Sequence, residues 1–314
     1  AQIGGVVLFM SQQNFQKPSL NHQQHIELLK NRGLIIADNA LAKHYLEYVG
    51  YYRLSGFFRS FYTQANNPNH NFKTNTAFVD TVNLYEFDTE LRSILLSGIE
   101  RLEVAVRAVI NNVMAEKYGS HWYLEQKLFI KEFNHQRFLR LIEKETQYHD
   151  KGGNNPIFQS YYKKYYTPEL PACWMLGEIL SFGALSKVFF NLRHGVDKLA
   201  IAKKFNMPHY KVLQSWLHAS CFTRNLCAHH AMICFKNFHI TPIKPVNWAS
   251  NEQKIFDKQH TVFLQATIVQ FLLKSASPNT KLAPLFTKLF NQYPSISIAK
   301  MGFDAGWENH EVWQ

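Results

Sequence analysis

Residues 221–230 concentrate the side chains of this chain that could carry out chemistry. One arginine, one asparagine, one cysteine and two histidines fall between Arg224 and His230. Arg224 supplies a permanently charged, planar guanidinium that suits a phosphate. His229 and His230 supply imidazoles, the side chain most often used for proton transfer near neutral pH. Together these residues predict a site for phosphodiester chemistry.

A helix must position these residues, because no glycine or proline occurs in residues 211–241 and the helix can run through Arg224 up to His230. On an ideal helix Asn225 and His229 are four residues apart on one face, so the amide can orient the imidazole. Arg224 and His229 diverge by roughly 140°. One such helix cannot surround a phosphate, and we expect a two-fold symmetric dimer to supply the facing copy.

Two other interpretations of the same segment stay open. A buried Arg–Asn pair could hold loops, with the histidines as packed spacers. A zinc site is the second, because Cys227 and His230 are three residues apart and Cys221, His229 and Cys234 are close by. The CxxC and HxxxH spacings of common structural zinc sites are absent, so we expect no metal and no cofactor.

Residues 224–230, Arg-Asn-Leu-Cys-Ala-His-His, resemble the RN-x-CAHH signature of the Abi-like family of bacterial abortive-infection proteins. Further blocks of that family occur in the same order between about Lys17 and Pro245: KPSL at 17–20, YYRLSG at 51–56, LYEFD at 84–88 leading to Arg107, and EILSFG at 178–183. The signature is a version of the R-x4–6-H motif of HEPN-domain ribonucleases. After His230 the chain departs from the family, because Ala-Met-Ile-Cys follows where members often carry Arg-Leu-Trp-Asn.

The resemblance implies an anti-phage endoribonuclease that cleaves RNA without a metal ion. In that scheme the 2′-OH of the substrate attacks the adjacent phosphorus. His229 would exchange protons with the attacking or leaving oxygen, and Arg224 would hold the phosphoryl oxygens. Asn225 would orient His229, and His230 is the reserve candidate for proton transfer. The resemblance also implies an active homodimer and a small noncoding RNA as a regulatory partner.

The composition agrees with an RNA partner. The chain has 314 residues and a net charge of +11, with an isoelectric point near 9.4. A cytoplasmic protein this basic usually has a polyanionic partner, most commonly RNA or DNA, although the charge could serve solubility alone. No run of eighteen apolar residues predicts a membrane span. Four unevenly spaced cysteines are typical of reduced thiols, so we expect a cytoplasmic location.

The most aromatic segment, residues 51–62, is a first candidate for RNA contact. Its rings alternate with Arg53 and Arg59, a combination that suits stacking on single-stranded bases. More often such rings belong to a helix buried against a core, and this is the interpretation we favour.

A second candidate is the run of four tyrosines and two lysines at residues 161–166. Lys163 and Lys164 could contact phosphates while Tyr161 and Tyr165 stack on bases. A surface helix whose tyrosines pack inward explains the same pattern equally well.

Helical periodicity without strand alternation predicts an all-α protein, and no Walker loop, GxSxG or HExxH motif supports another catalytic class. With the resemblance, the expected architecture is a HEPN-like helical bundle with an N-terminal helical lobe and a C-terminal helical extension. The predicted divisions are a flexible tail (1–16), the lobe (17–75), which ends in the polar loop 64–76, the HEPN-like domain (76–245) and the extension (246–314).

The longest predicted helix begins at Asp80, expected as its cap, and keeps a 3.6-residue apolar period to about Met114. Glu103 and Arg107 lie four residues apart within its charged stripe. A solvated ion pair explains them. The family resemblance implies an alternative, in which this face lies beside Arg224 and positions it.

Residues 197–217 resemble a helix-turn-helix with a turn at 206–208. A DNA-binding protein would expose basic and amide side chains on the second helix. Here that helix carries Val212, Leu213, Trp216 and Leu217, so packing is the favoured interpretation. A non-catalytic RNA-binding module and, after it, a helix-turn-helix DNA binder are the alternative functions.

Overall fold

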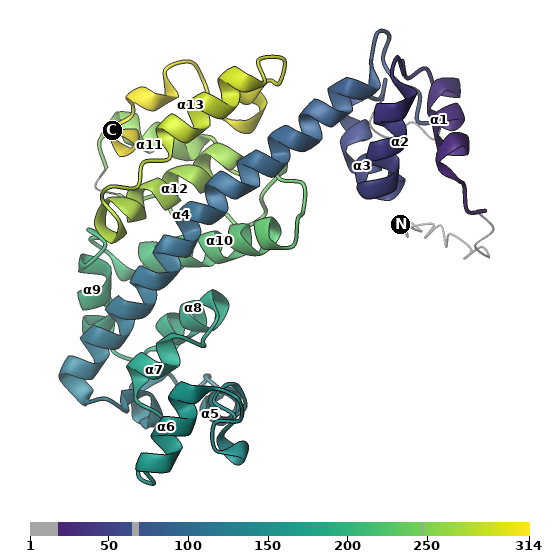
Figure 1. Cartoon of the computed structure of the whole chain (residues 1–314). Coiled ribbons are helices and arrows are strands. Elements are labelled where there is room, and N and C mark those ends of the chain that lie inside the picture. Colours follow the sequence, from purple (N-terminus) through teal and green to yellow (C-terminus); the bar gives the residue numbers. More distant parts are fainter. Residues whose placement is uncertain (1–17, 65–68, 247) are drawn as a thin grey trace, which may run out of the picture. The chain divides into compact units, whose positions relative to one another are not determined.

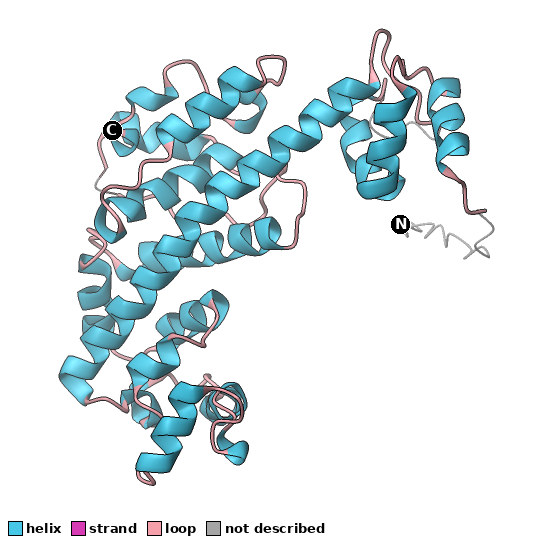
Figure 2. Cartoon of the chain, in the orientation of Figure 1, coloured by secondary structure: helices cyan, strands magenta, loops and turns pink. Residues whose placement is uncertain are grey.

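The computed structural model describes residues 18–64, 69–246 and 248–314 (Figure 1). Within these ranges every regular element is a helix, and β-pairing is limited to three isolated bridges (Figure 2). The prediction of an all-α protein is confirmed. The tail expected at residues 1–16 lies outside the described residues, as do residues 65–68 of the expected loop.

The chain divides into two compact units, residues 1–85 and 86–314. Their boundary falls inside helix α4 (Phe78–Tyr118), not in the polar loop before it. The predicted HEPN-like domain from residue 86 onward and the predicted extension, residues 246–314, lie in the same unit.

The first unit is built from α1 (His22–Asn31), α2 (Asn39–Tyr48), α3 (Tyr51–Phe58) and the beginning of α4. Asp38 caps α2, because its carboxylate accepts the N–H groups of residues 40 and 41. Leu54, Phe57 and Phe58 of the aromatic segment are buried. The core interpretation of these side chains is therefore confirmed.

Helix α4 is longer at both ends than its sequence pattern indicates. It begins at Phe78, and Asp80 sits in its first turn, where the carboxylate accepts the N–H of Ala77 at 2.8 Å. The prediction that Asp80 is the cap residue is wrong, because the carboxylate bonds back to the residue before the helix. The apolar stripe continues to the buried Met114, four residues before the helix ends.

Besides short 3-10 helices, the second unit contains the rest of α4 and nine further α-helices among its described residues: α5 (His135–Glu145), α6 (Pro156–Lys164), α7 (Cys173–Gly177), α8 (Phe182–Asn191), α9 (Gly195–Lys203), α10 (Tyr210–Ala228), α11 (Ser250–Gln253), α12 (Val262–Ala276) and α13 (Ala283–Gln292) (Figure 1). Helix α12 is apolar and buried on nearly all sides, which marks it as central to the unit. None of the described helices is sufficiently long and apolar to span a membrane.

Helices α4 and α10 both pack against α12. A methyl group at Gly98 of α4 would lie 3.2 Å from side-chain atoms of Val269 and Leu273, so the glycine permits the close approach. On α10, the Thr223 hydroxyl donates to Oε1 of Gln265 at 3.2 Å inside the core. The core of this unit therefore determines where α10 presents the residues of the motif.

The apolar side chains of α10 explain why residues 197–217 are not an exposed DNA-reading motif. Val212, Leu213, Trp216 and Leu217 are all buried. The Trp216 indole N–H donates to the Ile243 carbonyl at 2.9 Å. The packing interpretation of these four side chains is confirmed, because they form the buried face of the helix.

Candidate active site

The motif lies at the C-terminal end of α10, where the backbone reverses. The helix ends just before His229, and His230 adopts a left-handed conformation with φ of 57°. The N–H of Ala231 donates to the Leu226 carbonyl at 2.9 Å, and that of His230 to the Cys227 carbonyl at 3.0 Å. This pair of bonds is the Schellman motif, whose left-handed position usually holds glycine. A histidine there is uncommon.

Asp88 of α4 anchors the segment that follows the two histidines. Its Oδ1 accepts the backbone N–H groups of Ile233 and Cys234 at 2.8 and 2.7 Å, and its Oδ2 pairs with the Arg92 guanidinium. Both side chains of this pair are buried. Burial raises the pKa of the Asp88 carboxyl, while the N–H donors and Arg92 favour its charged form. The chain after the histidines is thus fixed to α4.

Glu103 of α4 lies between two arginines. Its Oε2 is 3.6 Å from Nη2 of Arg224, and its Oε1 is 3.4 Å from Nη2 of Arg107. The Glu103 and Arg107 side chains are only 12% and 16% exposed, so they are not a solvated pair. Arg224 remains 31% exposed. Of the two interpretations left open by the sequence, the structure supports the one in which this face of α4 positions Arg224.

Arg107 is held in turn by α7 and the turn that follows it. Its Nη2 donates to the Leu180 carbonyl at 3.4 Å. A methyl group at Gly177 would lie 3.0 Å from Arg107 Cγ and from Nδ2 of Asn111, so only glycine allows this approach without displacement. At Gly183 the corresponding contact, with a cysteine sulfur on α10, is an ordinary 3.5 Å.

Asn225 contacts the arginine of the motif. Its Oδ1 accepts a hydrogen bond from Nη1 of Arg224 at 3.2 Å, and its Nδ2 is 4.0 Å from the Cys221 sulfur. Its link to His229 is through the backbone, since the His229 N–H donates to the Asn225 carbonyl at 3.0 Å. Within the described residues the exposed His229 ring has no hydrogen-bond partner. The amide therefore orients Arg224 in this conformation, and does not make the expected contact with His229.

The cysteines and histidines that could have formed a zinc site differ in their burial. Cys227 and Cys234 lie in the core, whereas His229 and His230 are exposed. Burial raises the pKa of the Cys227 thiol to about 12 and also raises that of Cys234. No three His, Cys, Asp or Glu side chains in the described parts of the chain are arranged to hold a metal ion.

The tyrosine–lysine segment of α6 is divided between core and surface. Tyr161 is buried, and its hydroxyl donates to the Pro168 and Leu170 carbonyls. Only 8% of Tyr161 is exposed, which leaves little of the residue for a base to contact, and its role in RNA binding stays an untested prediction. Lys163, Lys164 and Tyr165 are exposed, and the Lys164 ammonium lies 5.2 Å from the centre of the Tyr165 ring.

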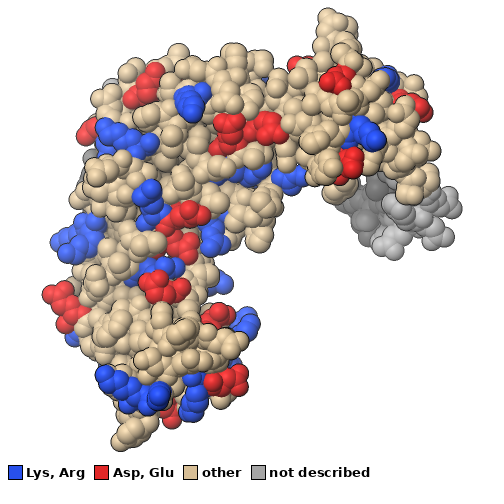
Figure 3. All heavy atoms as spheres, viewed as in Figure 1, with Lys and Arg blue, Asp and Glu red and all other residues tan. Residues whose placement is uncertain are grey.

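The other predicted RNA-contacting residues lie on α3 and the turn after it, in the first unit. The Arg53 guanidinium is 5.8 Å from the centre of the Tyr85 ring, which already occupies one of its faces. Arg59 is exposed. On the face of the protein in Figure 3, basic side chains are interspersed with acidic ones, so charge alone does not mark an RNA site there.

Sequence reasoning missed a groove of about 990 Å³ that begins at Asn225 and follows α10. Its basic lining residues are Lys187 on α8, Lys198 on α9, and Lys211 and His218 on α10. These residues belong to three helices that are separate in the sequence. The polar stripe on α10 was therefore the only feature of the sequence that could have indicated the groove.

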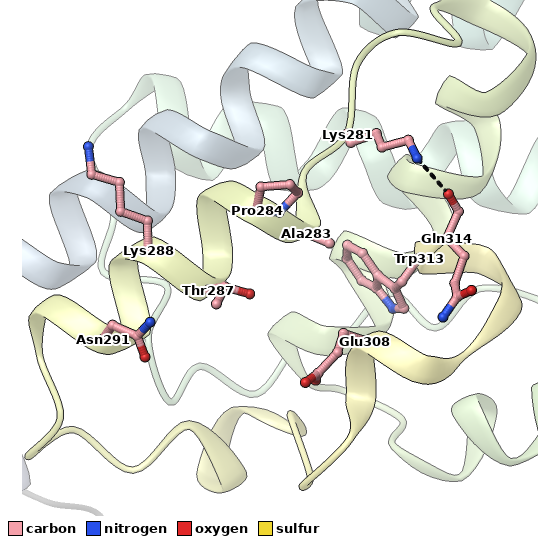
Figure 4. A pocket seen from close by; sticks show the side chains of 9 residues that line it. All are labelled: Lys281, Ala283, Pro284, Thr287, Lys288, Asn291, Glu308, Trp313 and Gln314. Atoms are coloured by element: carbon pink, nitrogen blue, oxygen red, sulfur yellow. Dashed lines mark hydrogen bonds between the residues drawn. The ribbon is translucent and has the colours of Figure 1, made fainter.

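A second hollow lies between α13 and the C-terminal residues (Figure 4). Trp313 and Glu308 line it, and Lys281 donates to the Gln314 carbonyl at 3.0 Å. It contains none of the motif residues, and it has no evident connection with the chemistry of the motif.

Comparison with known families matches residues 44–234 to the Abi-like protein family. The match begins later than the Lys17 at which the sequence resemblance was expected to start, and it includes the whole motif, α4 and the anchored segment up to Cys234. Comparison with curated proteins and with solved structures gives no match. Because the family match covers more than half of the 314 residues, the chain belongs to the Abi-like family and is a protein of the abortive-infection type.

Proposed function

We propose that this protein is a metal-independent endoribonuclease of the HEPN type that acts on RNA in the cytoplasm. The observation that carries the proposal is the support of Arg224: Glu103 and Asn225 hold its guanidinium at the surface, at the end of α10 that also carries His229. A positioned cation and an exposed imidazole are the two groups that phosphodiester cleavage by the substrate's own hydroxyl requires.

In the proposed reaction the 2′-oxygen attacks the adjacent phosphorus and the bond from phosphorus to the 5′-oxygen breaks. His229 takes the proton of the 2′-OH or delivers one to the leaving 5′-oxygen. Arg224 stabilises the charge that develops on the phosphoryl oxygens. The products are a 2′,3′-cyclic phosphate and a 5′-OH, so atoms and charges balance without an added cofactor.

The active species in this proposal is a homodimer that joins two Arg224 faces. Within one chain the motif supplies only one arginine, and among the described residues the His229 ring has no hydrogen-bond partner that orients it. A two-fold axis would place a second motif on the opposite side of the phosphate. We also propose a small noncoding RNA as a regulatory partner, in keeping with the family.

The test is cleavage of RNA by purified variants. Arg224→Ala and His229→Ala should each abolish cleavage with little change in thermal stability, and EDTA should leave wild-type cleavage intact. Mixed Arg224→Ala and His229→Ala chains should recover part of the activity, because a mixed dimer pairs one intact arginine with one intact histidine. If both variants cleave normally, the motif is not catalytic. A strictly monomeric particle that cleaves RNA would disprove the dimer.

A non-catalytic RNA-binding module is the second candidate function. It is favoured by the His229 ring, which has no hydrogen-bond partner in the part of the chain that the structure describes, since a general base is usually oriented by a neighbouring group. Under this alternative, RNA co-purifies with the protein and Arg224→Ala weakens binding, but no RNA ends with cyclic phosphate appear after induction.

A further inference from the structure

We propose that the groove along α10 binds a single-stranded segment of the RNA substrate that flanks the phosphate at Arg224. This inference rests on the proposed function and deepens it, because it assigns where the substrate strand lies. Four features of the groove support it: the direction of the groove, its charge, one buried lysine and one exposed aromatic ring.

The groove leads to the motif. The α10 residues that line it recur at three- or four-residue intervals from Tyr210 through Gln214, His218 and Cys221 to Asn225, and so form one face of the helix. Fifteen residues of helix span about 22 Å. The groove includes Asn225, whose amide contacts the guanidinium of the motif. A strand bound along this face would thus bring its next phosphate to the candidate active site.

The groove is basic. Its charged lining side chains are Lys187, Lys198 and Lys211, and no acidic residue lines it among the described residues. On the face of the protein that Figure 3 shows, by contrast, basic side chains are interspersed with acidic ones. Three lysines without carboxylates create a positive potential, which favours a polyanion over a neutral or cationic occupant.

Lys198 is the strongest indication that an anion belongs in the groove. Its side chain is buried, with 8% of the residue exposed, and its ammonium donates to the Phe190 carbonyl at 2.8 Å. The adjacent Asp197 does not pair with it, because that carboxylate binds Lys117 and Tyr118 at 2.6 and 2.8 Å. The ring of Tyr210 lies 5.4 Å from this ammonium, but no carboxylate among the described residues pairs with it. A buried ammonium without a counterion is unfavourable, and a bound phosphate would supply the missing negative charge.

The aromatic ring of Phe190 distinguishes a single strand from a duplex. This residue lines the groove beside the lysines and is 58% exposed. Base stacking on an aromatic ring and backbone phosphates on lysines are the two contacts by which proteins hold single strands. In a duplex the base faces are already stacked on each other. The groove therefore fits an unpaired strand.

The first experiment measures binding of a labelled RNA of about ten nucleotides by fluorescence anisotropy in the His229→Ala protein. Lys187→Gln and Lys211→Gln should each weaken binding by about tenfold. Each should also reduce the salt-dependence slope by about 0.7. The matched controls are Lys203→Gln and Lys204→Gln, exposed lysines at the end of α9 and just after it that do not line the groove.

Lys198→Met separates a ligand-binding role from a structural one. If the ammonium is retained for RNA, the apolar replacement keeps or raises the melting temperature while RNA binding weakens. A lower melting temperature with unchanged RNA binding would show that Lys198 only caps the Phe190 carbonyl, and would overturn its assignment.

The outcomes distinguish this inference from the proposed function. If groove variants bind and cleave RNA like the two control variants while Arg224→Ala does not cleave, the groove assignment fails and the endoribonuclease proposal stands. If groove variants lose RNA affinity but no variant or wild-type protein cleaves RNA, the groove assignment stands and the catalytic proposal fails. Equal affinity for single-stranded DNA of the same sequence would overturn the assignment to RNA.

Discussion

Replacing Asp88 by asparagine removes the charge that anchors the segment after the two histidines. The carboxylate is fully buried, accepts two backbone N–H groups at 2.8 and 2.7 Å, and pairs with a buried arginine, Arg92. Breaking a buried ion pair typically costs about 3–5 kcal/mol, because the remaining charge is left uncompensated. Asparagine retains one acceptor oxygen for the N–H groups, so we expect the lower end of that range, about 3 kcal/mol.

For a unit of this size each kcal/mol lowers the melting temperature by about 2–4 °C, which gives a decrease of about 10 °C for Asp88→Asn. Differential scanning calorimetry measures that decrease. Hydrogen exchange provides the local measurement, because the charged acceptor of the Ile233 and Cys234 amides is replaced by a neutral, weaker one. Their exchange should accelerate more than that of amides within α12.

The double variant Asp88→Asn/Arg92→Met tests the cause. Removal of the second charge should recover part of the lost stability, so the double variant should be more stable than the sum of the two single changes predicts. A melting temperature within about 2 °C of the wild type for Asp88→Asn would refute the reasoning. Strict additivity of the two substitutions would refute it as well.

Three further predictions concern the motif and its supports. His230→Gly should stabilise the protein by about 1 kcal/mol in thermal unfolding, because glycine adopts the left-handed conformation without the penalty of a side chain. If this variant no longer cleaves RNA, His230 and not His229 is the residue that transfers the proton. Gly177→Ala should lower RNA cleavage, because the added methyl group displaces Arg107, which pairs with Glu103. The matched Gly183→Ala variant should cleave normally. Equal cleavage by the two variants would contradict a role of Arg107 in positioning the site. At pH 8 a thiol reagent should modify the half-buried Cys221 first and Cys227 only after unfolding. The reason is that burial raises the pKa of the Cys227 thiol to about 12 and excludes the reagent. Mass spectra that show rapid labelling of both cysteines would contradict this prediction.

The sequence by itself determined the elements that depend on neighbours along the chain. The apolar residues of α10 recur at helical spacing, so both the helix and the burial of Trp216 could be predicted. The cap at Asp38 and the burial of Phe57 and Phe58 in α3 follow from equally local patterns. The family signature at residues 224–230 indicated the Abi-like family, and the catalytic roles of its residues stay predictions.

Some local details could not be predicted, because the usual signal was missing. The end of a helix in a Schellman motif is usually marked in the sequence by a glycine at the left-handed position. Here a histidine, His230, occupies that position. The pattern therefore extended α10 too far. Asp80 resembled a cap residue, but its carboxylate bonds back to the residue before the helix.

Only the tertiary structure decided which distant groups meet. Glu103 and Arg224 pair across 121 positions of sequence, and Asp88 reaches Ile233 across 145. Three helices contribute the lysines of the groove, among them Lys198. Helical periodicity states which face of a helix is buried, but not which other helix it contacts. Those contacts arise when α4 and α10 pack on α12, so the partners of Arg224 depend on the complete core.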